Sequence, residues 1–347
     1  MANKLYISKL DAIRGFAAFY VFLTHFVLIL KFIPYPIKIL FNFGQEAVIV
    51  FFLLSGFVIY LSVYQKPYLT FKYYFIRRFS RIYFPLLFSF AISIIIFYFN
   101  GDLDKSFSWT ELAGNLLMLQ DFSEVKPGSW LKPFLDNLPL WSLGYECWFY
   151  LIFFPVYSFL PKLPYKIYFI LAFCIISYLT YLTIPNHASL VISYFIIWWS
   201  GAEAAAVFTH QGRFTYKNMQ PVIFSLLLMS VITVIPVLSA EQIRFGYYPF
   251  LMFRHFFDAI VLILVGIFWY KNGLVSFDRI FGVFSKIAPI SYSLYILQYP
   301  LLTKWYIGNA TSALWGICAI KVTSILVLSY LIEIKLQPVV NQWFNKQ

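Results

Sequence analysis

Ionisable side chains interrupt several long apolar segments of this sequence. Arg14 and His25 share the first segment, eleven positions apart, which is about three helical turns plus 20°. Both residues therefore project from one face of a helix, separated by about 16 Å along its axis. An imidazole at such a depth suits proton transfer, and a guanidinium suits anion binding. The alternative is an arginine that snorkels to the membrane surface and a histidine that only packs.

Two further segments carry polar residues that we expect near the depth of His25. Glu146 lies about 10 to 12 Å along a segment that starts near residue 138. In another segment Arg254 precedes His255 and Asp258, which share a helix face at positions i and i+3. Buried charges are costly in hydrocarbon, so function is the preferred interpretation for His25 and Glu146. An ion-pair network that includes Glu146 and only holds helices together explains Arg254 and Asp258 equally well.

A basic cluster of Arg77, Arg78 and Arg81 stands where the third apolar segment begins. Arg78 and Arg81 are one turn apart if this stretch is helical, and guanidinium groups bind phosphate through paired hydrogen bonds. A basic cluster at a membrane boundary is, however, usually an anchor for topology and lipid headgroups. Ser55 lies in the middle of the second segment, where a small residue suits helix packing or a substrate channel better than nucleophilic catalysis.

Membrane helices must position these side chains. The chain has 347 residues, of which 61% are hydrophobic, 22% aromatic and 12% charged, and this composition excludes a disordered, fibrous or ordinary soluble protein. We therefore expect an all-α, polytopic membrane helix bundle of about ten transmembrane helices, forming one domain over residues 1–347 without an appended soluble domain. The predicted spans are 10–31, 44–64, 82–100, 139–160, 167–184, 188–208, 220–238, 250–270, 287–307 and 312–334.

The distribution of charge predicts the topology. The net charge is +12, and a basic excess in alternate loops marks the cytoplasmic side of a membrane protein. Both termini should share that side. The outer loop over residues 101–138 contains six acidic residues against Lys105, Lys126 and Lys132. The basic residues assigned to the cytoplasmic side are Lys66, Lys72, Arg77, Arg78, Arg81, Lys162, Lys166, Arg213, Lys217, Lys271, Arg279 and Lys286.

Several kinds of site are excluded by the absence of their motifs. The sequence has no zinc-ligand spacing, no glycine-rich phosphate loop and no Gly-x-Ser-x-Gly turn. Cys147, Cys174 and Cys318 all lie in apolar runs, so they predict neither a disulfide framework nor a metal site. We expect no metal and no nucleic-acid partner, because the basic residues serve topology.

Five stretches carry a family resemblance when they are taken in order. They are Leu10–Ala18 with His25 completing an Arg-x10-His motif, Phe51–Phe57, Arg78-x-x-Arg81, Leu140–Glu146 followed by Phe149, Tyr150 and Pro155, and Ser291–Tyr295. Together they resemble the acyltransferase-3 family of integral membrane acyltransferases, which includes bacterial O-acetyltransferases. Two stretches depart from the family pattern. Gln45–Ala47 replaces a segment that often has a second glycine, and Gln298 stands where histidine is common, which leaves hydrogen bonding in place of proton transfer.

The resemblance implies transfer of an acyl group, most often acetyl, from cytoplasmic acyl-CoA to a hydroxyl of an extracytoplasmic or lipid-linked glycan such as lipopolysaccharide O-antigen. It implies a multi-pass protein of the bacterial inner membrane, with acetyl-CoA as substrate and no permanently bound cofactor. The other implied partners are a carbohydrate acceptor and membrane lipids, and the oligomeric state stays open.

The resemblance also implies roles for particular residues. The implied donor-binding residues are Arg14, Ser55, Arg78, Arg81 and Tyr292, and the implied acceptor-binding or supporting residues are Trp141, Ser142, Arg254, His255 and Asp258. His25 is then the general base for the acceptor hydroxyl or forms an acyl-histidine, and the sequence leaves both open. Glu146, the second catalytic residue, orients the His25 ring or holds sugar hydroxyls.

The competing interpretation is a polytopic transporter or flippase of a glycan or acyl carrier, which also carries buried charges. The absence of an inverted repeat and the Arg14–His25 pairing on one helix speak against it. An assay of acyl-CoA turnover separates the two, because a pure transporter consumes no donor. A third interpretation, a non-catalytic scaffold, leaves the buried charges unexplained.

Overall fold

The computed structural model describes residues 2–30, 32–66, 68–159, 166–307 and 314–345. Within these ranges the chain is helical with short connections, and it contains no named strand. The longer helices are α1 (Ala2–Ile29), α3 (Gly44–Tyr64), α4 (Phe71–Asn100), α7 (Leu140–Phe159), α8 (Lys166–Thr183), α9 (His187–Gln211), α10 (Gln220–Leu238), α11 (Phe250–Lys271) and α14 (Leu314–Tyr330). The predicted all-α membrane bundle is confirmed.

Shorter helices fill the connections and the chain ends. They are α2 (Tyr35–Ile39), α5 (Leu103–Ser106), α6 (Trp109–Leu116), α12 (Phe277–Phe281), α13 (Ser291–Tyr299) and α15 (Gln337–Asn345). Single turns of other helix types are η1 (Phe134–Asp136), η2 (Gly282–Lys286), η3 (Ala288–Ile290), η4 (Pro300–Lys304) and η6 (Leu331–Leu336).

Each of the ten predicted spans overlaps a helical segment of the described structure, while residues 31, 160, 312 and 313 at their ends lie outside it. The segments differ in whether they are long and apolar enough to cross a membrane. Among the described residues, 8 helices are long and apolar enough to cross a membrane, and a bent pair over 277–304 brings the number to 9. The remaining predicted span is α7, which is 20 residues long but is not among them. Its first turns carry Ser142 and Glu146 and are largely buried in protein, so they need less apolar surface than a lipid-facing helix.

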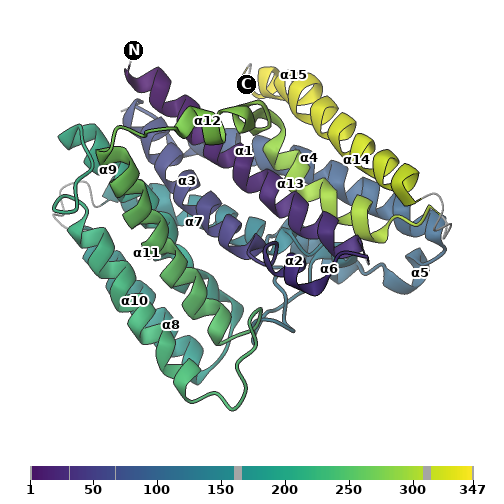
Figure 1. The fold of residues 1–347 in the computed structure, drawn as a ribbon, viewed down its shortest axis with the longest axis horizontal. Coiled ribbons are helices and arrows are strands. Elements are labelled where there is room, and N and C mark those ends of the chain that lie inside the picture. The colour runs from purple at the N-terminus through teal and green to yellow at the C-terminus, as the bar shows by residue number, and fades with distance from the viewer. Residues whose placement is uncertain (1, 31, 67, 160–165, 308–313, 346–347) are drawn as a thin grey trace.

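The start of α1 and the end of α15 lie at the same end of the bundle, while α5 and α6 lie toward the opposite end (Figure 1). That both termini are cytoplasmic stays a prediction. We call the end with the termini the inner end and the opposite one the outer end, following the basic loops. Lys162, one of the basic residues behind that assignment, lies outside the described residues.

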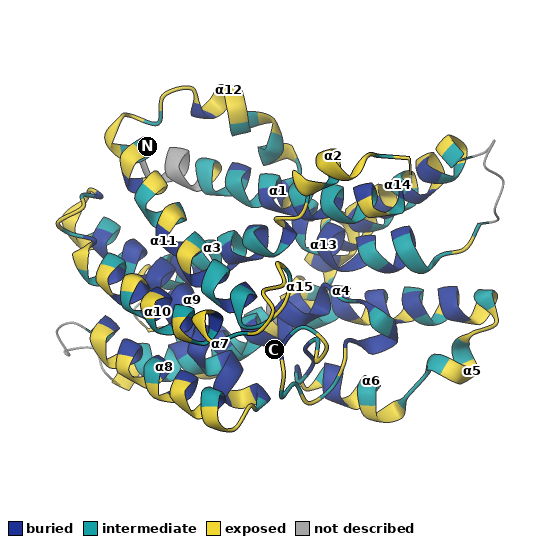
Figure 2. Ribbon diagram, turned by 60° about the horizontal axis from the view of Figure 1, so that its bottom comes forward, coloured by how far each residue is buried: buried dark blue, intermediate teal, exposed yellow. Residues whose placement is uncertain are grey.

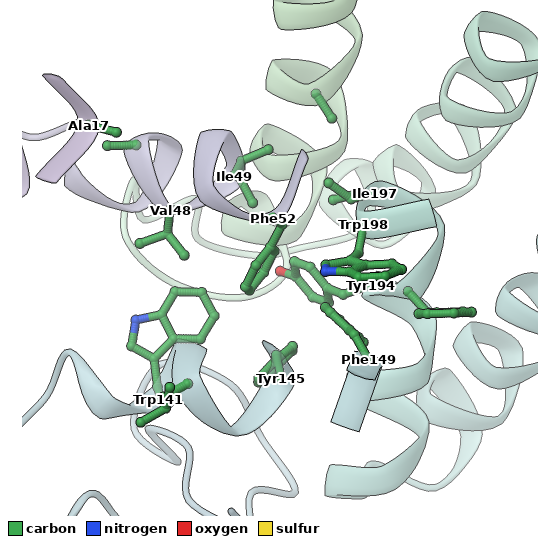
Figure 3. Close-up of a cluster of buried hydrophobic side chains, with 14 of the residues drawn as sticks. Ala17, Val48, Ile49, Phe52, Trp141, Tyr145, Phe149, Tyr194, Ile197 and Trp198 are labelled. Atoms are coloured by element: carbon green, nitrogen blue, oxygen red, sulfur yellow. The ribbon is translucent and has the colours of Figure 1, made fainter. Parts of the chain in front are cut away.

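The core forms where α3, α7 and α9 meet. On one side of it lie α8, α10 and α11, and on the other lie α1, α4, α13 and α14 (Figure 1). The ring of Phe52 of α3 packs against those of Tyr145 and Phe149 of α7, and Phe149 in turn contacts Trp198 of α9 (Figure 3). Exposed residues concentrate on the outward faces of α8 and α10 (Figure 2). These faces carry the apolar side chains expected against lipid.

Glycine lets α3 and α9 approach closely. A Cβ atom added to Gly201 of α9 would lie 1.9 Å from the carbonyl oxygen of Leu53, and one added to Gly56 of α3 would lie 2.0 Å from that of Trp198. Both contacts are with backbone, which cannot move aside cheaply. Small residues at helix crossings are a common device in membrane bundles, because they allow van der Waals contact between backbones.

The predicted ninth span is bent by 43° between Phe277–Lys286 and Ala288–Lys304, and its second part changes from α13 to the π turn η4 at Pro300. Pro300 follows α13 directly and has no N–H to donate to the carbonyl four residues earlier. The oxygen of that residue, Ile296, instead accepts hydrogen bonds from Ser89 Oγ at 3.2 Å and from Asn137 Nδ2 at 2.9 Å. The chain therefore satisfies inside the bundle a group that lipid could not hydrate.

The turn η4 that follows Pro300 is also held by distant side chains. The buried Lys321 of α14 donates through Nζ to the carbonyl oxygen of Leu302 at 2.7 Å. Asn100, at the end of α4, donates to the carbonyl oxygen of Lys304 at 2.7 Å. The turn η4 thus occupies a fixed position among α4, α13 and α14.

The outer loop folds back into the bundle instead of extending from it. Its Asp121 donates through the backbone N–H to the carbonyl of Leu131 at 2.8 Å, and Gln120 donates through its side chain to the carbonyl of Leu140 at 2.8 Å. Asp121 and Lys126 are buried. The loop therefore belongs to the packed part of the molecule.

Candidate functional site

An inner cavity of about 130 Å³ lies among α1, α3, α4, α7 and α13. All of the predicted donor-binding residues line it, together with Asp11, Ser142, Glu146, Tyr150 and Tyr295. The predicted donor-binding residues are Arg14, Ser55, Arg78, Arg81 and Tyr292. The structure therefore brings together five residues from four helices that the sequence had grouped.

The arginines reach this cavity because α4 starts earlier than the predicted span. The helix begins at Phe71, where the N–H of Tyr73 donates to Thr70 Oγ1 at 3.4 Å as an N-terminal cap. Arg78 and Arg81 thus lie one helical turn apart, as expected. Their position on one continuous helix places both guanidinium groups at the inner end of the cavity.

Two of these guanidinium groups are held in place by contacts within the protein and still have N–H donors that no protein group uses. Arg78 donates to Ser62 Oγ at 2.7 Å, and its guanidinium lies 5.9 Å from the ring centre of Tyr74. Arg14 donates to the carboxylate of Asp11. The buried Nε atoms of Arg14 and Arg78 have no hydrogen-bond partner among the described residues. Such preorganised, unused donors suit an anionic ligand.

Glu146 belongs to the inner cavity and not beside His25. The hydroxyl of Tyr150, one turn further along α7, donates to the Glu146 carboxylate, and Tyr150 also shares a 2.9 Å hydrogen bond with Ser55 Oγ. The expectation that Glu146 lies in one polar layer with His25 and orients its ring is not met by this geometry. The i, i+4 spacing on α7 gives Glu146 a partner from its own helix.

An outer cavity of about 230 Å³ contains His25. Thr24, Asn42, Gln45, Lys126 and Trp141 contribute to its lining, and Asn42 is exposed at the outer end. The expected separation on α1 is therefore found, since Arg14 lines the inner cavity and His25 the outer one.

The His25 ring is fixed by packing more than by hydrogen bonds. It meets the ring of Tyr299 edge-on, with 5.1 Å between the ring centres. The buried Gln298 lies beside it, at the position where the family often has histidine. Nδ1 of His25 and both side-chain polar atoms of Gln298 have no partner of normal geometry within the described structure. An imidazole with an unused nitrogen can accept a proton from a ligand in this cavity.

A buried ion pair in the wall of the outer cavity was missed by the sequence analysis. Lys126 Nζ lies 2.9 Å from Asp121 Oδ1, donates to the Tyr145 hydroxyl at 3.2 Å, and lies 3.7 Å from the ring centre of Trp141. Burial lowers the pKa of Lys126, while the carboxylate of Asp121 acts in the opposite direction. In the sequence both residues count only as loop charges, and no motif indicates that the loop returns to the bundle.

The predicted acceptor residues occupy different environments. Ser142 lines the inner cavity and Trp141 the outer one. His255 is fully buried, with its ring nearly parallel to that of Trp141 at 6.3 Å and its Nδ1 2.8 Å from the Tyr194 hydroxyl. His255 lines neither cavity, so it packs against Trp141 without contributing to the lining of the outer cavity.

Arg254 and Asp258 also line neither cavity. Arg254 forms an ion pair with Glu46 of α3, donates to the carbonyl of Phe245, and has its guanidinium 3.3 Å from the ring centre of Phe245. For Arg254 this geometry agrees with the alternative of an ion pair that holds helices together, although the partner is Glu46 and not Glu146. Asp258 forms no ion pair within the described residues, and its Oδ2 atom has no hydrogen-bond partner there. The sequence could have indicated Glu46 as a buried partner, because it is an acidic residue, within Gln45–Ala47, of an otherwise apolar segment.

Comparisons with known proteins agree with the resemblance found in the sequence. A family model described as an acyltransferase domain matches residues 7–334. Acyltransferase MdmB from Streptomyces mycarofaciens is 33% identical over 168 residues, which cover 46% of this chain and 41% of that protein. The chain thus matches less than half of the relative's length. No solved structure gives a significant match.

Proposed function

This chain belongs to the acyltransferase family whose model spans residues 7–334, and from that premise we propose that it moves an acyl group, most often acetyl, from cytoplasmic acyl-CoA to a hydroxyl of a glycan outside the membrane. The coarser statement, a multi-pass membrane acyltransferase, follows from the family and from the apolar helices. The single observation that carries the finer proposal is the presence of two cavities with different chemistry, one at each end of α1.

The inner cavity supports an acyl-CoA donor. Three guanidinium groups, those of Arg14, Arg78 and Arg81, line it, and coenzyme A carries several phosphate charges that guanidinium binds bidentately. The narrow pantetheine arm then extends along the cavity toward the outer end. Ser55 and Tyr292 lie along that path.

The outer cavity supports a hydroxyl acceptor. His25 takes the proton of the acceptor hydroxyl, the hydroxyl oxygen bonds to the acyl carbon, and the carbon–sulfur bond breaks. The proton ends on the sulfur of coenzyme A, so the reaction needs no further reactant. An acyl-histidine intermediate uses the same residue as nucleophile and gives the same products. A bacterial inner membrane and a surface polysaccharide acceptor remain parts of this proposal.

Sealed vesicles of known orientation test the proposal. Radiolabelled acetyl-CoA is supplied on the inner side only, and surface polysaccharide from a bacterial host is supplied on the outer side only. We expect label on the polysaccharide and release of coenzyme A on the inner side. Transfer that occurs only when both substrates share the inner side refutes the proposed route, and an absence of donor turnover favours the transporter alternative.

The variant His25→Ala examines the catalytic assignment in the same vesicles. Loss of a positioned general base lowers the rate by about 10² to 10⁴-fold, with donor binding retained because His25 lies outside the inner cavity. His210→Ala is the matched control, since His210 bonds Tyr60 at the inner end of α9 and lines neither cavity. A folded His25→Ala protein with wild-type turnover contradicts the assignment.

A further inference from the structure

Among the residues that the structure describes, the inner and outer cavities share only two lining residues, Val48 of α3 and Tyr295 of α13. The Tyr295 side chain is buried, at 7% exposure, and its ring meets that of Phe51 at 5.7 Å. These two residues form the wall between the cavities, which we call the partition. Neither of them was singled out as a site residue by the sequence.

Hydrogen bonds hold the Tyr295 hydroxyl at the junction of the cavities. It donates to the carbonyl oxygen of Pro139 at 2.9 Å and lies 2.8 Å from Ser142 Oγ. Pro139 lines only the outer cavity, and Ser142 lines only the inner one. The hydroxyl is therefore fixed between a group of each cavity, and the ring fills the space between them.

The partition conflicts with the geometry that acyl transfer needs. The reacting carbon and oxygen must approach to about 3 to 3.5 Å before the bond forms. A thioester in the inner cavity and a hydroxyl beside His25 are separated by the Tyr295 ring. Of the two residues, Tyr295 has a side chain that is held by hydrogen bonds, which can be exchanged, and it belongs to the short helix α13. Val48 lies within the long helix α3.

We propose that Tyr295 is a gate residue that closes the passage between the two cavities and moves aside when the acyl group crosses. This inference rests on the proposed function. In the closed position the ring keeps water of the outer cavity away from the thioester. Water would otherwise replace the acceptor hydroxyl, its oxygen bonding to the acyl carbon while the proton goes to the sulfur, and the products would be free acid and coenzyme A.

Cysteine labelling tests the gate without any substrate. The reporter is Ser55→Cys, which lines only the inner cavity, in a protein whose Cys147, Cys174 and Cys318 are replaced by alanine. A membrane-impermeant methanethiosulfonate reagent is added outside intact cells. We expect the reporter to be protected, and Tyr295→Ala to increase its labelling rate at least tenfold.

A matched control separates the gate from a general loosening of the bundle. Tyr178→Ala removes another buried tyrosine side chain, from a residue of α8 that lines neither cavity, and should leave the reporter protected. Leu143→Cys is a second reporter in the inner cavity, in case the first one disturbs folding. Equal labelling in Tyr295→Ala and Tyr178→Ala overturns the proposal.

Hydrolysis of acetyl-CoA in the absence of acceptor gives a second measurement on the purified protein. Tyr295→Ala should raise this hydrolysis several-fold relative to wild type, and Tyr295→Phe, which keeps the ring but loses both hydrogen bonds, should raise it less. A fall of hydrolysis and transfer together in Tyr295→Phe refutes the gate and assigns the hydroxyl to the chemistry instead. If wild type neither binds nor consumes acetyl-CoA, the proposed function fails, and the labelling result still decides whether Tyr295 separates the cavities.

Discussion

Replacing Lys126 with methionine should unfold the outer loop from the bundle, because it leaves a buried carboxylate without its cation. The side chains of Lys126 and Asp121 are only 3% and 0% exposed, and their charged atoms are 2.9 Å apart. Breaking a buried ion pair by removing one partner costs about 3 to 5 kcal/mol. Methionine keeps a side chain of similar length, so the variant removes the charge and its contacts with Asp121 and the Trp141 ring at little loss of volume.

A double-mutant cycle measures the interaction energy of Lys126 and Asp121 separately from the contacts that each makes with other residues. The cycle compares Lys126→Met, Asp121→Asn and the double variant, with unfolding of the purified protein followed in one detergent. We expect each single change to lower the free energy of unfolding by about 3 to 5 kcal/mol. The double variant should recover about 0.5 to 3 kcal/mol of the summed loss, because it buries no unpaired charge.

Lys105→Met is the control for removing a lysine from the same loop. Lys105 is exposed, so its replacement should change the free energy of unfolding by no more than about 0.5 kcal/mol. If Lys126→Met falls within that range of the control, the loop is not held by this pair. The reasoning that makes Lys126 a structural element of the outer cavity would then be wrong.

Three further predictions concern the inner cavity and the core. Arg78→Ala should weaken acetyl-CoA binding about tenfold or more, and the loss of affinity should be larger at low salt. Arg77 lies outside the cavity, so Arg77→Ala should leave the affinity unchanged, and calorimetry measures both variants. Glu146→Gln removes a carboxylate from a cavity that binds an anion, so the donor should bind roughly two- to tenfold tighter; an unchanged donor Kd would indicate that Glu146 serves the acceptor alone. Gly201→Ala should destabilise the protein by about 1 to 3 kcal/mol through overpacking, while Gly266→Ala, with open space around it, should not; thermal unfolding compares the two.

The sequence predicted those features that depend on local spacing. Helical periodicity alone placed Arg14 and His25 three turns apart on α1, and they line cavities at different depths. The i, i+3 spacing of Arg78 and Arg81 holds for the same reason. These relations are fixed by the rise and rotation of a single helix.

The sequence predicted the contacts between different helices less well. Depth alone grouped Glu146 with His25, but depth does not determine which face of α7 a residue occupies relative to α1. Lys126 gave no signal, because the return of a loop depends on tertiary contacts such as that between Asp121 and Leu131. Tyr295 could not be recognised as a partition, since a boundary between two cavities exists only once five helices are assembled.

The hydrogen bond between Lys321 and Leu302 bears on how the chain enters the membrane. A lysine at the centre of a span adds about 2.5 to 3.5 kcal/mol to the free energy of insertion, so α14 on its own enters the membrane less favourably than its apolar length suggests. The carbonyl it needs belongs to η4, which is synthesised before it. Lys321 therefore has its hydrogen-bond acceptor in η4, and the two segments should enter the lipid as a pair. The earlier segment should stay beside the translocon until the later one has been synthesised.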